Sequence, residues 1–208
     1  MKIERFTVGP LMTNCYLVTC EKTNESVIID PGDVSSDLLI KVKEHTLKAI
    51  LLTHGHFDHI GGVRALIDET GVESLLVHTL DAPMLTDPHL NGSFMVGVPI
   101  SACEPSGYLT EGEDVVFGES SLKVIHTPGH SAGGVSFVSD EEFVIAGDTL
   151  FRLSIGRWDL PGGDYATLIK TLKEKFSTMP VSTKVYPGHG EITDIGFEKT
   201  HNQFLLNA

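Results

Sequence analysis

Short apolar runs that end abruptly in glycine and histidine constrain the fold of this chain more than any other feature. The clearest run, residues 49–52, is typical of a buried strand and leads through one threonine into the sequence His-Gly-His-Phe-Asp-His. In an extended chain, residues two apart point to the same side, so His54 and His56 can bind one ion together. The turn into the next helix then directs Asp58 and His59 towards a neighbouring position.

A single histidine is usually an ordinary core or surface residue. Three histidines and one aspartate within six residues at a strand end reverse that expectation. Imidazole and carboxylate ligands without a thiolate suit zinc, iron or manganese. The segment therefore predicts a transition-metal site.

Three further segments place a metal-type side chain just after a predicted strand. His130 lies in the sequence Thr-Pro-Gly-His-Ser-Ala-Gly-Gly, Asp148 follows an apolar run and a glycine, and His189 lies between two glycines. Each of these alone is most simply explained as a turn residue. Because all of them present metal-type ligands at strand ends, we expect them to join the first segment in one centre.

The order of the predicted elements favours two packed sheets with helices outside. A doubly wound parallel sheet is disfavoured, because the first strands are too closely spaced for helical crossovers. We expect one domain over residues 1–208, with a long irregular loop at 81–108. The predicted strands are 3–8, 14–18, 27–29, 49–52, 75–77, 114–117, 122–126, 135–138, 143–146 and 184–186, and the predicted helices are 35–45, 60–70, 165–176 and 196–206.

The composition and net charge limit the kinds of molecule that this chain is expected to bind. The net charge of −13 and the lack of a basic cluster argue against nucleic acid. No run of about 18 apolar residues could span a membrane, and the first ten residues lack the apolar region of a signal peptide. The three cysteines show no CxxC pairing, which is typical of reduced thiols in the cytoplasm. We expect a cytoplasmic protein with a small-molecule substrate.

The pattern HxHxDH, followed by a downstream His, an Asp and a last His, resembles the metallo-β-lactamase fold superfamily. The resemblance implies an α+β fold, a four-layer αββα sandwich of two packed mixed sheets with external helices. It also implies two divalent metal ions per chain, with zinc expected and iron or manganese as alternatives. In that reading the first ion is held by His54, His56 and His130, the second by Asp58, His59 and His189, and Asp148 bridges them.

Within that superfamily, three stretches resemble small glyoxalase-II-like hydrolases. These are Asn14-Cys15-Tyr16, Gly147-Asp-Thr-Leu-Phe and Ser154-Ile-Gly-Arg-Trp-Asp-Leu-Pro-Gly-Gly. The sequence after His189 is too short for the C-terminal helical domain that contacts glutathione in full-length glyoxalase II. The resemblance therefore implies hydrolysis of a thioester, or of a related ester such as a lactone, and leaves glutathione recognition open.

The chemistry implied by two ions is activation of water. Ions about 3.5–4 Å apart can share a hydroxide that attacks a carbonyl carbon. Asp58 then has two candidate roles, as a metal ligand and as the catalytic residue that orients the hydroxide. No GxSxG motif indicates a side-chain nucleophile.

Several residues remain with two interpretations. Asp30, before Pro-Gly, is either a turn residue or a partner of a ligating histidine. Arg157 and Asp159 either line the substrate entrance or form a plain salt bridge. Five other histidines are expected to be structural or surface residues: His45, His78, His89, His126 and His201.

The HxHxDH motif is also compatible with functions other than hydrolysis of an ester. The first alternative is a mononuclear iron enzyme resembling the persulfide dioxygenases of the superfamily. A purely structural metal is disfavoured because structural zinc sites are usually closed and rich in cysteine. A ribonuclease of the superfamily is disfavoured by the acidic charge.

Overall fold

Six strands from the first half of the chain form one mixed sheet in the computed structural model, which describes residues 1–206. The first three strands are antiparallel, and the last four run parallel to one another. The parallel strands need long crossovers, which the helices described below supply. In spatial order they are β1 (Lys2–Val8), β2 (Thr13–Thr19), β3 (Glu25–Ile29), β4 (Thr46–Leu51), β5 (Leu75–His78) and β6 (Gly107–Leu109).

The second half of the chain builds the other mixed sheet. Only one pair in it is parallel, β10 with β13, and a helical crossover connects that pair. In spatial order the strands are β14 (Thr193–Asp194), β13 (Lys184–Pro187), β10 (Phe143–Gly147), β9 (Val135–Ser139), β8 (Ser120–His126) and β7 (Asp114–Phe117). A short hairpin follows β10 and consists of β11 (Leu150–Phe151) and β12 (Ser154–Ile155).

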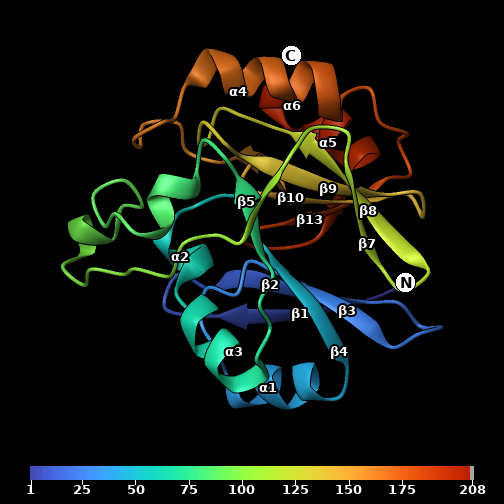
Figure 1. Ribbon diagram of the computed structural model, residues 1–208. Helices are drawn as coiled ribbons and strands as arrows, with labels where there is room; N and C mark the ends of the chain where they lie inside the picture. Colours follow the sequence, from blue (N-terminus) through green and yellow to red (C-terminus); the bar gives the residue numbers. More distant parts are fainter. Residues whose placement is uncertain (207–208) are drawn as a thin grey trace.

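The two sheets pack face to face, as Figure 1 shows. The layer between them is apolar and includes Leu51 of β4 and Phe137 of β9, both fully buried. Burying each such side chain stabilises the fold by about 1.5–3 kcal/mol. Tyr16 of β2 is equally buried in this layer, and its hydroxyl group reaches the second sheet.

Helices cover the two outer faces, which confirms the predicted αββα arrangement (Figure 1). On the first sheet they are α1 (Ser36–Lys43), α2 (Phe57–Ile60) and α3 (Val63–Thr70). On the second they are α4 (Tyr165–Thr171), which continues as a π-helix over Leu172–Phe176, α5 (Ile195–His201) and α6 (Gln203–Leu206). No helix within residues 1–206 has the length and hydropathy needed to cross a membrane.

Two of the predicted helices are interrupted. The one expected at 60–70 starts earlier and is interrupted after α2, where the Gly62 amide donates a hydrogen bond to the Pro31 carbonyl oxygen at 2.8 Å instead of to the preceding helical turn. The one expected at 196–206 breaks at Asn202, whose extended backbone lets its side-chain amide donate a hydrogen bond to the Ser154 carbonyl group at 3.0 Å.

The segment expected to be an irregular loop at 81–108 contains more structure than the sequence predicts. Two short 3-10 helices, η1 (Ala82–Leu85) and η2 (Ser93–Val96), lie within it, and it ends in β6. Elements of three or four residues carry too little periodicity to be read from sequence.

The three cysteines form no disulfide within the described residues 1–206. All three are free; Cys15 and Cys20 are buried and Cys103 is half-buried.

Candidate metal centre

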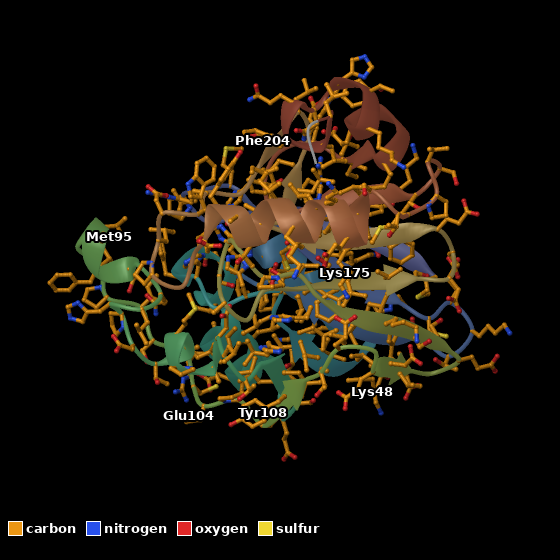
Figure 2. The ribbon with its side chains drawn as sticks, turned by 90° about the horizontal axis from the view of Figure 1, so that it is seen from above. Lys48, Met95, Glu104, Tyr108, Lys175 and Phe204 are labelled. Atoms are coloured by element: carbon orange, nitrogen blue, oxygen red, sulfur yellow. The ribbon has the colours of Figure 1, made fainter. Side chains whose placement is uncertain are left out.

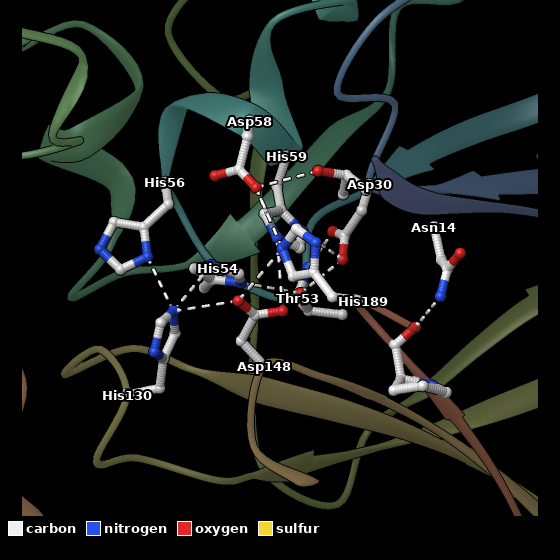
Figure 3. A network of polar contacts seen from close by, with 12 residues as sticks. Asn14, Asp30, Thr53, His54, His56, Asp58, His59, His130, Asp148 and His189 are labelled. Atoms are coloured by element: carbon white, nitrogen blue, oxygen red, sulfur yellow. Dashed lines mark hydrogen bonds and ion pairs between the residues drawn. The ribbon is translucent and has the colours of Figure 1, made fainter. Parts of the chain in front are cut away.

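The structure brings all seven predicted ligands to one edge of the sandwich, where strands of both sheets end. Figure 3 shows the group between the α2 region above and the second sheet below. The connection between β4 and α2 supplies two of them, α2 itself supplies two more, and the loops after β8, β10 and β13 supply one each. In chain order the seven are His54, His56, Asp58, His59, His130, Asp148 and His189.

Three buried imidazoles form the first group. His56 Nδ1 lies 2.8 Å from His130 Nε2, and His130 Nε2 lies 3.2 Å from His54 Nε2. The three rings therefore direct one nitrogen each at a common point, as expected for an ion bound by neutral imidazoles.

A second group lies beside it. Asp58 Oδ2 is 3.1 Å from His189 Nε2 and 3.5 Å from His59 Nε2. The side chains of Asp58 and His189 are partly exposed, whereas His59 is fully buried. This mixed set of carboxylate and imidazole ligands also suits a divalent transition metal.

Asp148 lies between the two groups. Its Oδ2 atom is 3.5 Å from His130 Nε2 of the first group and 3.5 Å from His189 Nε2 of the second, and its Oδ1 atom is 3.4 Å from His59 Nε2. One carboxylate thus reaches both groups, as the resemblance implied.

Hydrogen bonds on the far side of the rings fix their orientation. His130 Nδ1 donates to the Arg157 carbonyl oxygen at 2.7 Å, and His189 Nδ1 donates to the Leu11 carbonyl oxygen at 3.2 Å. In each case the Nδ1 hydrogen is bound to a carbonyl group, so that Nε2 faces the centre and is the atom that a neutral ring offers to an ion.

Asp30 fixes the orientation of two more histidines, His59 directly and His54 through Thr53. Its Oδ2 atom accepts from His59 Nδ1 at 2.9 Å and from the Thr53 hydroxyl group at 2.6 Å, and that hydroxyl oxygen lies 3.0 Å from His54 Nδ1. Asp30 adopts a left-handed backbone with φ of 53°, a conformation that few residues other than glycine accept. Of the two interpretations of Asp30, the partner of a ligating histidine is the one the structure supports.

Burial and neighbouring charge shift the histidines in opposite directions. Burial lowers the pKa of His54 far below its usual value and that of His56 to about 3, and the neighbouring imidazoles add to both effects. Burial would also lower the pKa of His59, but three carboxylates raise it well above its usual range. The pKa of His189 is raised, because hydrogen bonding to Asp58 and the charge of Asp148 outweigh burial.

The carboxylates of the centre remain ionised. Burial alone would raise the pKa of Asp58 and of Asp148, but the surrounding imidazoles, His59 first among them, lower both. The centre therefore combines anionic oxygens with imidazole nitrogens, which is the donor set of a cation site.

Buried polar atoms without hydrogen-bond partners test whether cations fit. Among the described residues, His59 Nε2 and Asp148 Oδ1 are buried and make no hydrogen bond, and both point into the cluster. The two atoms lie 3.4 Å apart as an ion pair, and buried polar atoms without a hydrogen bond cost free energy unless another group binds them. The residues present thus fit two divalent cations.

A buried aspartate that sequence reasoning missed joins two ligand-bearing loops. Asp81 is fully buried, and its carboxylate accepts from Gly55 N at 3.1 Å, from Ser131 Oγ at 2.7 Å and from Gly133 N at 2.6 Å. It links the loop of His54 and His56 to the loop of His130. Nothing in the local sequence distinguishes it from a turn residue.

Two β2 residues hold the loop of His189. The Asn14 side-chain amide donates to the carbonyl oxygens of Pro187 and Gly190, both at 3.0 Å, and the Tyr16 hydroxyl group donates to Pro187 at 2.6 Å. The sequence Asn-Cys-Tyr marked the family resemblance without indicating this role.

The remaining candidates are also placed. Arg157 forms a two-pronged ion pair with Asp159 at 2.7 and 2.9 Å and also lines the cavity over the centre, so both interpretations apply to it. Within residues 1–206, the metal-type groups contain none of the five other histidines, and His78 and His126 stack on each other with ring centroids 4.4 Å apart.

Comparison with known proteins agrees with this geometry. The family described as the metallo-beta-lactamase superfamily matches residues 8–189. The chain is similar to the probable metallo-hydrolase YqgX of Bacillus subtilis (40% identity over 99% of this chain and 98% of the relative) and to the hydroxyacylglutathione hydrolase GloC of Haemophilus influenzae (36%, with the same coverage).

Solved structures lead to the same family. BLEG-1, a B3 metallo-beta-lactamase, superimposes with a TM-score of 0.92 at 41% identity, covering 98% of this chain and 99% of that one. TTHA1623 in a di-iron-bound form superimposes with a TM-score of 0.86 at 40% identity, covering 97% and 100%. With its fold, its His/Asp centre and this similarity along nearly its whole length, the chain belongs to the metallo-β-lactamase superfamily.

Proposed function

We propose that this chain is a binuclear metal-dependent hydrolase whose substrate is a thioester or a related ester such as a lactone. The observation that carries the proposal is the position of Asp148, within 3.5 Å of His130 in one group and of His189 in the other. A carboxylate shared in this way suits a pair of ions. The similarity to a relative named as a hydroxyacylglutathione hydrolase supports the thioester.

The ligand assignment follows the two groups. His54, His56 and His130 would hold one ion, Asp58, His59 and His189 the other, and Asp148 both. Bound divalent cations supply positive charge that lowers the pKa of water and polarises a carbonyl group. Zinc is the ion we expect, and the di-iron form of a similar protein supports iron as an alternative.

Asp58 is the residue that can orient the attacking water. The Thr13 hydroxyl group donates to its Oδ2 atom at 2.9 Å, and His189 lies on the same oxygen, so Oδ1 is left for the cavity that Asp58 lines. Water attacks the carbonyl carbon, the carbon–sulfur bond breaks, and the thiolate leaves. Asp58 accepts a hydrogen bond from the attacking water and orients it, and the proton lost by the water passes to the solvent or to the leaving thiolate.

The test is metal content and hydrolysis measured on the same sample. We expect about two divalent ions per chain and metal-dependent cleavage of S-lactoylglutathione or of other thioesters and lactones. At most one ion, with no hydrolysis across the panel, would contradict the proposal. Oxygen consumption by the iron-loaded protein with glutathione persulfide would instead establish the dioxygenase alternative, which leaves the group of Asp58, His59 and His189 unexplained.

A further inference from the structure

An apolar cavity of about 470 Å³ opens directly onto the metal centre. His56, Asp58 and His189 form part of its floor. A substrate whose carbonyl group lies at the centre must therefore place its substituents in this cavity. Its lining indicates which substituents fit.

The walls are apolar and come from segments far apart in the sequence. The turn between β1 and β2, the start of α2, η2, β11 and the loop before α4 all contribute. The six apolar side chains are Leu11, Phe57, Met95, Val96, Phe151 and Leu160.

Three of these side chains are strongly exposed. Leu11 is 49% exposed, Met95 65% and Val96 54%. Figure 2 shows Met95 at the end of the green segment that projects beyond the sheets. Contiguous exposed apolar side chains around a functional cavity usually mark a ligand-binding surface.

The apolar segment η2 is held in a fixed place relative to the centre. Asn91, fully buried, donates through its side chain to the carbonyl oxygens of Met84 and Ile100, both at 2.9 Å. The Asn91 carbonyl oxygen accepts from Phe57 N at 3.1 Å, next to the ligand Asp58. Met95 and Val96 thus belong to a preformed wall, and binding need not first order it.

The charges of the side chains around the cavity disfavour a substrate with an anionic substituent. Among the residues that line the cavity, Arg157 is the one lysine or arginine, and both prongs of its guanidinium group are bound to Asp159. The protein as a whole carries a net charge of −13. A substrate with free carboxylates would find no unpaired cationic side chain in this lining.

We infer that the wall formed by Leu11, Met95, Val96 and Phe151 selects substrates with an uncharged, apolar acyl chain next to the scissile carbonyl group. This inference rests on the proposed function and deepens it. Compounds that carry several carboxylates, such as glutathione thioesters, are the poorer substrates. Each added methylene group contacts the wall and raises kcat/KM by about two- to fourfold until the cavity is full.

The experiment uses the metal-loaded protein and acyl thioesters of N-acetylcysteamine, a neutral thiol, with chains from acetyl to octanoyl. We expect kcat/KM to rise with chain length, and the hexanoyl ester of N-acetylcysteamine to be cleaved faster than hexanoylglutathione. Met95→Ser combined with Val96→Ser should flatten the dependence on chain length. Val181→Ser, at a residue that is 63% exposed and outside the cavity lining, should leave it unchanged.

Binding provides a readout that does not depend on turnover. Calorimetry with inert ketone analogues, in which a methylene group replaces the thioester sulfur, should show the same rise in affinity with chain length, and the double variant should lose it. Hydrolysis without any dependence on chain length, or faster cleavage of the glutathione ester, would overturn the inference while the proposed function stands. No cleavage of any thioester or lactone would instead overturn the proposed function.

Discussion

The Gly133 amide donates a buried hydrogen bond of 2.6 Å to the Asp81 carboxylate. This bond connects a loop of the first sheet to a loop of the second. The chain comes so close here that a Cβ atom on Gly133 would contact the same carboxylate. Burial raises the pKa of Asp81, although the hydrogen bonds from Ser131, Gly133 and Gly55 oppose that shift. The bond therefore belongs to a buried polar network that fixes two ligand loops relative to each other.

Replacing this carboxylate should weaken both the fold and the metal site. Asp81→Asn keeps the shape but exchanges one acceptor oxygen for a donor, which then faces the N–H and O–H donors. We expect a loss of about 2–3 kcal/mol in the free energy of unfolding and a ten- to hundredfold loss of metal affinity. Urea denaturation and metal competition measure these. Asp140→Asn, at an exposed residue, should change neither, and equal effects of the two variants would refute the role of Asp81.

The second ion should depend on His189 and the first should not. His189→Asn removes a ligand from the group of Asp58 and His59 and leaves the three imidazoles of the other group untouched. We expect one ion per chain in place of two, and a fall in kcat/KM of at least about hundredfold. Elemental analysis and thioester kinetics check both. Retention of two tightly bound ions would show that His189 is not a ligand.

The side-chain amide of Asn14 should affect the affinity for the second ion, although Asn14 is not one of its ligands. Asn14→Ala removes both hydrogen bonds to the loop of His189, and Tyr16→Phe removes a third. We expect each variant to lose about 1–2 kcal/mol of stability and to weaken the second ion about tenfold, with the first ion unchanged. Titration with a chromophoric chelator separates the two affinities. Tyr108→Phe, at a tyrosine that is 58% exposed, is the matched control and should behave like the unmodified protein.

Metal uptake should release protons near neutral pH. The carboxylates raise the pKa of His59 and of His189, so the metal-free protein keeps these rings protonated above the usual histidine value of about 6.5. A ring must lose its proton to bind a metal through Nε2. Each of these rings releases one proton on binding metal while it is still protonated, so the number of protons released should be highest below the raised pKa values and fall as the pH rises through them.

Calorimetric metal titrations at pH 7, in buffers of different ionisation enthalpy, give this number directly. His54 and His56 contribute none, because burial lowers their pKa and they are already neutral. His189→Asn should lower the count. A count of zero in the unmodified protein at pH 7 would contradict the charge state assigned to His59.

The sequence indicated the seven candidate ligands more clearly than the residues that support them. His54 follows an apolar run and a threonine, and three others, His130, Asp148 and His189, each come directly after a glycine close to the end of a predicted strand; these local patterns need no knowledge of the fold. The two-sheet arrangement could be predicted for a similar reason, from the close spacing of the first strands.

Asp81 and the walls of the cavity could not be found in this way. The role of Asp81 depends on contacts with Gly55 and Ser131, which lie 26 and 50 residues away along the chain. Likewise, Leu11 and Met95 meet at one cavity only because the β1–β2 turn and η2 converge over the centre. Such pairings depend on the packing of the whole chain, which no short window of sequence contains.

The shared position of Asp148 between His59 and His189 has a consequence for biosynthesis. A chain leaving the ribosome presents His54 and His59 early, but the loop that carries His189 emerges only after the whole first sheet and all but the last strand of the second. A cation captured before that point would meet an incomplete and more mobile set of ligands. We therefore expect the two proposed ions to be loaded after translation, and the supply of metal around the finished chain to determine which elements it carries.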